Sequence, residues 1–126
     1  MSINGFAIFC DDIRFEANGK AMLIGVYSED LVPGVLPQVT PMSFWVKLSG
    51  IPDSKLNLKL SVGSNGKIQH TADIDLSIQD MERPVNLYFA GLPVSIEESG
   101  NVFIEISGFK DNFVFRDELK VMPVPS

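Results

Sequence analysis

Cysteine is almost absent from this 126-residue sequence, since Cys10 is the only one. A disulfide framework within the chain is therefore impossible, and this use of cysteine fits a reducing compartment. Histidine is equally scarce, and the single His70 cannot form a His-rich metal site. No segment approaches the ~20 consecutive apolar residues of a transmembrane helix, and the apolar run at residues 6–10 is too short for a signal peptide. We therefore expect a cytoplasmic protein that does not enter a membrane.

Positive charge is also sparse, because 10 Lys and Arg residues stand against 16 Asp and Glu residues. The net charge is −6, the sequence pI is about 4.6, and no two basic residues are adjacent. Binding to nucleic acid requires a basic surface that releases counterions from the phosphates. We therefore expect neither nucleic acid nor an anionic membrane as a partner.

What the sequence does contain is a regular alternation of apolar and polar residues over short segments, as in residues 56–62. A period of two residues is typical of an antiparallel strand with one face in water. Two Asn-Gly pairs, Asn18-Gly19 and Asn65-Gly66, each join two such segments. Asn-Gly is the pair that a two-residue type I′ turn prefers, so we expect a β-hairpin at each position.

The alternation and the turn residues place eight strands along the chain. They are expected at residues 6–15, 21–27, 42–48, 56–62, 67–78, 85–89, 101–107 and 113–121. The sixth strand is expected to reach at most a little past Gly91, with Pro93 capping any continuation, because proline cannot donate to a β-ladder. The connecting segments 28–41 and 80–84 are long enough to cross between two sheets.

These strands predict an all-β fold in a single domain that covers residues 1–126. We expect an antiparallel two-sheet sandwich of about eight strands, with an immunoglobulin-like Greek-key order. Apolar residues make up 45% of the chain, which suffices for a two-layer core without disulfides or metal. The inward parity of the strands predicts one shared core of Phe44, Val46, Leu58, Leu60, Ile74, Leu76, Leu87, Ile104 and Ile106.

The first hairpin resembles the opening of a known but uncharacterised protein family. The matching segments are Cys-Asp-Asp-Ile-Arg at 10–14, Gly-Lys at 19–20 and Leu-Ile-Gly-Val-Tyr at 23–27. The strand at 100–106, the turn at 110–112 and the last strand, 116–121, are similar to the family's ending. Its members are small bacterial and phage-borne proteins that share a domain of unknown function. The resemblance implies a β-sandwich of bacterial or phage origin, and no activity, cofactor or site.

Carboxylates are concentrated around the first hairpin, at Asp11, Asp12, Glu16, Glu29 and Asp30. Loop carboxylates can bind Ca²⁺, which takes six or more oxygen ligands. Their spacing does not match an Asp-x-Asp-x-Asp loop, and the other interpretation is that they pair with basic residues across the hairpin. Calcium is therefore the one ion that the sequence leaves open, and we expect no other metal.

Four further residues have chemically capable side chains but ordinary structural explanations. Asp73 and Asp75 lie on one face of a strand, where a carboxylate pair suits acid–base chemistry, but alternate acids also keep a strand soluble. His70 and Cys10 lack the sequence context of a nucleophile with its base, so we expect a partly buried histidine and a buried, inert thiol. We therefore expect no enzymatic activity and no cofactor.

Three aromatic residues, Trp45, Tyr27 and Tyr88, are the candidate interaction surface. Trp45 lies on the polar parity of its strand, so its indole is expected either to face out or to be covered by the 28–41 loop or the core. An exposed Trp or Tyr can anchor a protein partner or stack on a sugar. We expect a non-enzymatic protein-interaction or structural module that binds a protein partner or self-associates, with binding of a small ligand or carbohydrate as the alternative.

Overall fold

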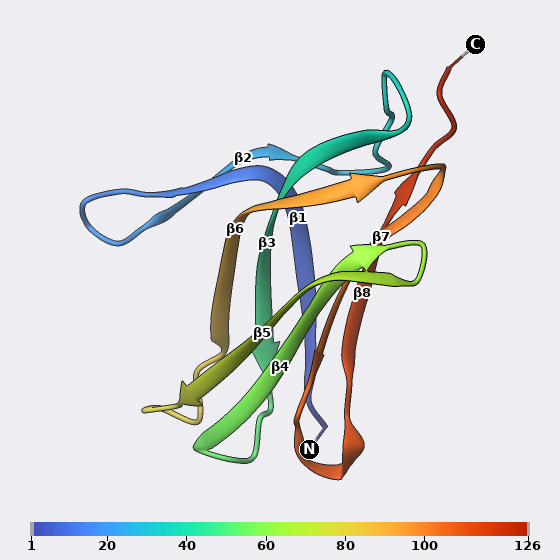
Figure 1. The fold of residues 1–126 in the computed structure, drawn as a ribbon. Helices are drawn as coiled ribbons and strands as arrows, with labels where there is room; N and C mark the ends of the chain where they lie inside the picture. The colour runs from blue at the N-terminus through green and yellow to red at the C-terminus, as the bar shows by residue number, and fades with distance from the viewer. Residues whose placement is uncertain (1, 126) are drawn as a thin grey trace.

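The computed structural model describes residues 2–125, which form two antiparallel four-stranded sheets packed face to face (Figure 1). The strands are β1 (Asn4–Phe15), β2 (Ala21–Val26), β3 (Gln38–Ser49), β4 (Lys55–Ser64), β5 (Lys67–Ser77), β6 (Val85–Ile96), β7 (Gly100–Ser107) and β8 (Phe115–Val121). The only helical segment in this range is a short 3₁₀ turn, Lys110–Asn112, so no described helix could span a membrane. The predicted all-β sandwich of eight strands is confirmed.

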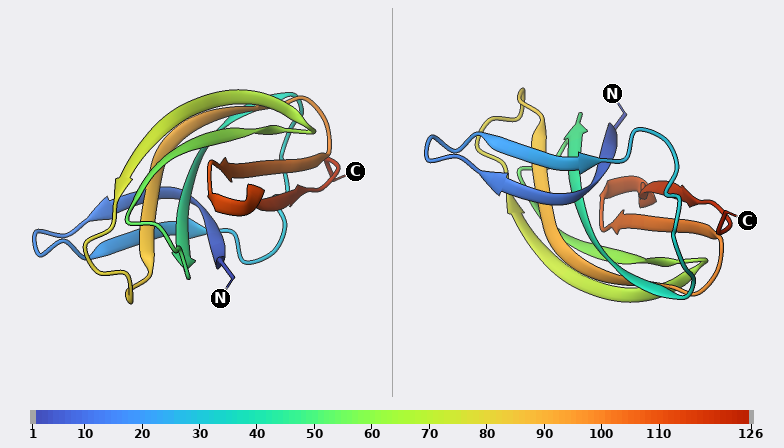
Figure 2. Two further views of the ribbon diagram at one scale, coloured as in Figure 1. Left: turned by 90° about the horizontal axis from the view of Figure 1, so that it is seen from below. Right: turned by 90° about the horizontal axis from the view of Figure 1, so that it is seen from above.

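The strand order is β2-β1-β3-β6 in one sheet, called sheet A here, and β5-β4-β7-β8 in the other, called sheet B. In an immunoglobulin domain the first, second, fourth and fifth strands share a sheet. Here the fourth and fifth strands lie in the opposite sheet from the first two, so the expected immunoglobulin-like order is not the order observed. The two views in Figure 2 show the sheets curving around a common interior.

One of the two connections predicted to cross between the sheets does so. The segment 78–84 leads from β5 in sheet B to β6 in sheet A, as expected. The long segment 27–37 instead joins β2 to β3, which lie on either side of β1 in sheet A. On its way it reaches the edge of sheet B, where Leu31 forms a parallel bridge with Val121 and is itself buried. The segment therefore closes one end of the core instead of changing sheets.

The two Asn-Gly turns differ in geometry. At Asn65-Gly66 both residues have positive φ, 48° and 78°, as a two-residue type I′ turn requires. At the first turn only Gly19 has positive φ, and the backbone N–H of Glu16 donates to the carbonyl of Lys20 across three intervening residues. This is a three-residue loop with glycine in the left-handed position, so the hairpin is confirmed but its predicted turn type is not.

Strands β3 and β6 are longer than the sequence predicts, because both continue through a proline. Pro41 lies directly opposite Pro93 in the β3–β6 ladder. Neither proline has an N–H, but alternate pairs of an antiparallel ladder exchange no hydrogen bonds, so this pair loses nothing. The β1–β3 pairing ends at Ser43, so β1 does not need a donor from Pro41 either. The prediction that Pro93 caps the sixth strand is therefore wrong.

The core lies between the sheets and contains most of the predicted residues. Six of the nine are buried, namely Phe44, Val46, Leu58, Leu60, Ile104 and Ile106. The other three, Ile74, Leu76 and Leu87, are partly buried and pack against this cluster. They lie on β5 and β6, which are edge strands, and an edge strand has cover on one side only.

Those two edge strands are joined by side-chain hydrogen bonds. Gln69 of β5 bonds to the backbone of Ser95 in β6, and a ring nitrogen of His70 bonds to the Pro93 carbonyl. The hydroxyl of Ser64 in β4 also donates to the Ser95 carbonyl. These bonds close one side of the sandwich between sheets that share no backbone ladder there.

Candidate functional site: an aromatic surface on sheet A

Two of the three predicted aromatic residues lie together on the outer face of sheet A. The β3–β6 register places Trp45 directly opposite Tyr88, while the neighbouring Val46 points into the core. The two ring planes are nearly parallel, at 6°, and their centroids are 6.3 Å apart. Parallel, offset rings on adjacent strands are a favourable cross-strand pair.

Neighbouring side chains hold Trp45 in one orientation. Its indole N–H donates to the side-chain oxygen of Asn86 at 2.9 Å, and the edge of the Phe6 ring contacts it with centroids 5.6 Å apart. The ammonium group of Lys47 lies 5.9 Å from the centroid of the indole, within range of a cation–π attraction. The indole is thus ordered before any partner binds.

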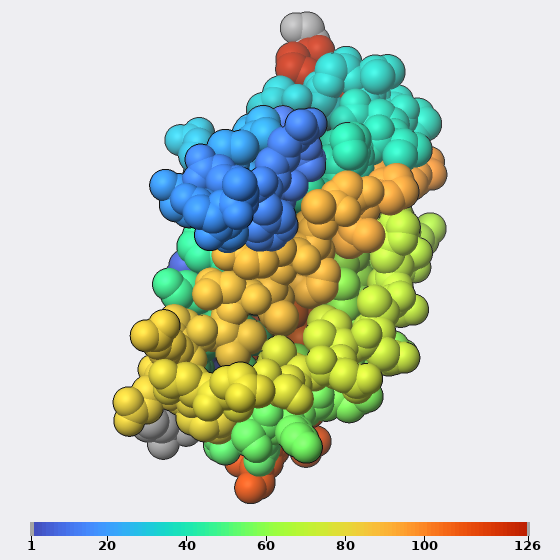
Figure 3. Space-filling model, turned by 90° about the vertical axis from the view of Figure 1, so that its left-hand side faces the viewer, coloured from blue at the N-terminus to red at the C-terminus, as the bar shows by residue number. Residues whose placement is uncertain are grey.

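The β1–β2 hairpin bends over this face and adds a second wall. β1 pairs with β3 only from Asn4 to Cys10 and with β2 only from Cys10 to Phe15, so it changes partner at Cys10. Beyond that point the hairpin turns across the sandwich and contacts β6, as Figure 3 shows in blue against orange. Phe15 reaches Tyr88 edge to face, with ring centroids 5.1 Å apart.

A hollow of about 230 Å³ lies between the hairpin and the sheet. Ala21 and Leu23 of β2 line one side, and Trp45 and Tyr88 line the other. Tyr88 is 37% exposed, and the neighbouring Phe6 and Phe15 rings are 46% and 56% exposed. We call the four rings of Phe6, Phe15, Trp45 and Tyr88 the aromatic surface.

Tyr27, the third predicted residue, is not part of the aromatic surface. It follows β2, its ring packs against the core, and its hydroxyl donates to the Asp11 carboxylate at 2.9 Å. Burial, together with the hydrogen bond to Asp11 and its negative charge, raises the pKa of Tyr27 from its ordinary 10.0 to about 12. Tyr27 therefore ties the end of β2 to β1.

The sequence alone did not reveal the two Phe residues or the role of Asn86. Strand parity signals Trp45 and Tyr88, because each interrupts a polar face. Phe15 meets Tyr88 only because β1 bends after Cys10, and no alternation pattern encodes that bend. The 27–37 segment does not cover Trp45, since it runs to β8 instead.

The acidic residues of the first hairpin have separate partners. Asp11 accepts from Tyr27, Asp12 pairs with Arg14 at 3.0 Å, and Glu16 pairs with Lys20 at 3.6 Å. Within residues 2–125, no group of three or more His, Cys, Asp and Glu side chains is arranged to hold a metal ion. These contacts favour the pairing interpretation of the hairpin carboxylates.

The remaining chemical candidates also lie apart from one another. Asp73 and Asp75 are exposed on β5, where Asp75 accepts from the Asn57 amide at 2.7 Å. Cys10 is fully buried in sheet A, and burial raises the pKa of its thiol, with a further rise from the Asp11 carboxylate. His70 lies in sheet B, so cysteine and histidine do not form a nucleophilic pair.

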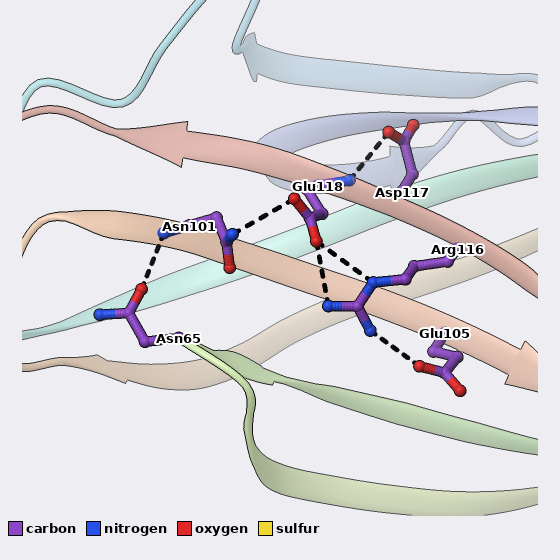
Figure 4. Close-up of polar contacts among 6 residues, drawn as sticks. All are labelled: Asn65, Asn101, Glu105, Arg116, Asp117 and Glu118. Carbon is purple, nitrogen blue, oxygen red and sulfur yellow. Dashed lines mark hydrogen bonds and ion pairs between the residues drawn. The ribbon is translucent and has the colours of Figure 1, made fainter.

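A charged cluster covers the outer face of sheet B (Figure 4). Arg116 pairs with Glu105 at 2.8 Å and with Glu118 at 3.0 Å, and its guanidinium lies 4.4 Å from the ring centroid of Phe103. Phe103 lies opposite Gly63 in the β4–β7 ladder and is 2% exposed, although it is not on the core face. The cluster covers the outward-facing ring of Phe103, so we interpret it as a structural feature.

Comparison with protein families gave no matching family model, and comparison with curated proteins gave no similar sequence. The resemblance of the first hairpin to a bacterial and phage-borne family therefore stays a prediction.

Proposed function

We infer that this chain is a non-enzymatic protein-interaction module, of bacterial or phage origin and acting in the cytoplasm, that binds a protein partner through the aromatic surface. The observation that carries the proposal is the ordered Trp45–Tyr88 ring pair beside the hollow. Trp and Tyr are the residue types most enriched at the energetic centres of protein interfaces.

The aromatic surface offers apolar contact area, and its side chains have little conformational entropy to lose when a partner binds. The hydrogen bond to Asn86 and the Phe6 contact fix the indole, and Phe15 restricts the Tyr88 ring. A side chain that is already ordered costs less free energy to immobilise when a partner binds. Fixed rings around a hollow are therefore suited to receiving an apolar side chain from a partner.

The size of the hollow favours a protein partner over a small ligand. Ligand pockets usually measure ~300–1,000 Å³ and enclose most of the ligand. The hollow here is smaller, at about 230 Å³, and only four residues line it. That volume suits one inserted side chain, with the exposed Phe rings contacting the rest of the partner.

The second candidate is a small-ligand or carbohydrate-binding sandwich that uses the same rings. The nearly parallel planes of Trp45 and Tyr88 favour it, because flat rings side by side offer an apolar face for a sugar to stack on. Trp45 is the only tryptophan, so its fluorescence reports on this surface alone.

Site-specific photo-crosslinking in cells of the native host tests the proposal. A photoreactive phenylalanine analogue replaces Tyr88 in one variant and the exposed Asp73 on sheet B in a matched control. We expect a discrete crosslinked protein from position 88 that is lost when Trp45→Ala is added. Equal crosslinking from positions 88 and 73 would contradict the proposal. A saturable change in Trp45 fluorescence with oligosaccharides, without a crosslink at 88, would favour the second candidate.

A further inference from the structure

Two edge strands of the sandwich, β5 and β8, are protected against pairing with another chain, and a third, β6, is protected in its distal half. β5 carries Asp73 and Asp75 on its outer face, and charged residues discourage edge-to-edge association. β8 is covered where the N–H of Leu31 donates to the Lys120 carbonyl, at 2.8 Å. The distal half of β6 is occupied by the Gln69 and His70 side chains.

The fourth edge, β2, has neither a charge nor a cover. Its six residues, Ala-Met-Leu-Ile-Gly-Val, include no charged side chain. It pairs with β1 on one side and is the terminal strand of sheet A on the other. Figure 1 shows the hairpin projecting away from the body of the sandwich, so this edge is open to approach.

One face of β2 presents an unbroken apolar row. Met22, Ile24 and Val26 are 43%, 44% and 47% exposed. They point away from the hollow, which Ala21 and Leu23 line from the opposite face of the same strand. This row is therefore separate from the aromatic surface.

The row is self-complementary when two copies of β2 run antiparallel. If Ile24 of one copy lies opposite Ile24 of the other, Met22 of each copy lies opposite Val26 of its partner. Every contact between the two exposed rows is then apolar. No like charges oppose each other in this register, because β2 carries no charged side chain. A second copy of the chain thus matches β2 in polarity.

We propose that two copies of the protein associate through their β2 edges, centred on Ile24, and join their two A sheets into one continuous sheet. The contact is isologous, so it closes at two copies and forms no fibre. A six-residue edge gives a small interface, and small interfaces support weak, concentration-dependent association.

A cysteine at position 24 tests the register directly. Opposed residues in an antiparallel pair have Cα atoms about 4.5–5.5 Å apart, within the range that a disulfide spans. We expect Ile24→Cys to form a disulfide-linked dimer under oxidised glutathione. Ile68→Cys, at a 60% exposed position on β5, is the control and should stay monomeric. The native Cys10 is buried and stays in both variants.

Sedimentation velocity from micromolar to millimolar concentration completes the test. We expect the unmodified chain to shift from monomer to dimer, and Ile24→Lys to stay monomeric with an unchanged circular dichroism spectrum. A strictly monomeric native chain would overturn the proposal, as would a dimer that persists in Ile24→Lys or that gives no disulfide at position 24. Trp45→Ala should leave dimerisation unchanged, so this result does not depend on the proposed function.

Discussion

The side chain of Gln69 in β5 pairs with both backbone polar groups of Ser95 in β6. Its amide nitrogen donates to the Ser95 carbonyl at 2.8 Å, and its amide oxygen accepts from the Ser95 N–H at 2.7 Å. The same nitrogen lies 3.0 Å from the Ser64 hydroxyl. One glutamine thus replaces the neighbouring strand that the edge of sheet A lacks, and it links the two sheets.

Replacing Gln69 with Ala should lower the free energy of unfolding by about 1 kcal/mol, because the hydrogen bonds to Ser95 are lost where water can partly replace them. Urea unfolding followed by circular dichroism measures this. Gln79→Ala, in the exposed segment before β6, is the matched control and should change the stability little. Equal effects of the two substitutions would contradict the role of the pair.

Truncating Leu60 or Ile104 to Ala should cost about 2–5 kcal/mol of stability, because each leaves a cavity in a packed core. Leu60 is 3% exposed and Ile104 is fully buried. Ile68→Ala serves as the control, since Ile68 is 60% exposed. Denaturant midpoints that fall together for all three variants would mean that the core is not where the structure places it.

Gly25→Ala should destabilise the first hairpin by about 1 kcal/mol or more. Gly25 has a φ of +67°, and a Cβ at this position would fall on the Asp11 carboxylate. Gly34→Ala is a suitable control, because its φ is not positive and a Cβ there meets no atom within 4 Å. A Gly25→Ala variant as stable as Gly34→Ala would show that Asp11 and Gly25 are not in close contact.

Stability should fall as the pH rises from about 10 to about 12, and Tyr27→Phe should reduce that fall. The pKa of Tyr27 in the folded chain is raised to about 12 from an ordinary 10.0 by burial and by the Asp11 carboxylate. A raised folded-state pKa gives stability that is complete below the unfolded value and is lost as the pH passes the folded one. Titration of tyrosinate absorbance, with Tyr88→Phe as the control, assigns the late transition to Tyr27.

Strand number, most core positions and two of the aromatic surface residues are predictable from the sequence, because they depend on a period of two and on local turn residues. The pairing of the strands is not predictable from the sequence, since the β3–β6 and β4–β7 ladders join residues far apart in the chain. Pro93 is a misleading local signal, as its effect depends on the residue it faces, and that residue is Pro41. No local pattern shows that the Tyr27 hydroxyl reaches Asp11, because that contact joins residues 16 positions apart in the chain.

The change of partner at Cys10 divides β1 into two parts that should differ in amide hydrogen exchange. Before Cys10 the strand belongs to the ladder with β3, whose Phe44 and Val46 are fully buried, and opening it disrupts the core. After Cys10 it is paired only with β2, and the hairpin can separate from Tyr88 while the sandwich stays intact. The N–H of Glu16 donates to Lys20, so the alternate amides of Arg14 and Asp12 also face β2. These amides should therefore exchange through local opening, much faster than those of β4. The width of the hollow therefore changes when the hairpin moves, while the core stays packed.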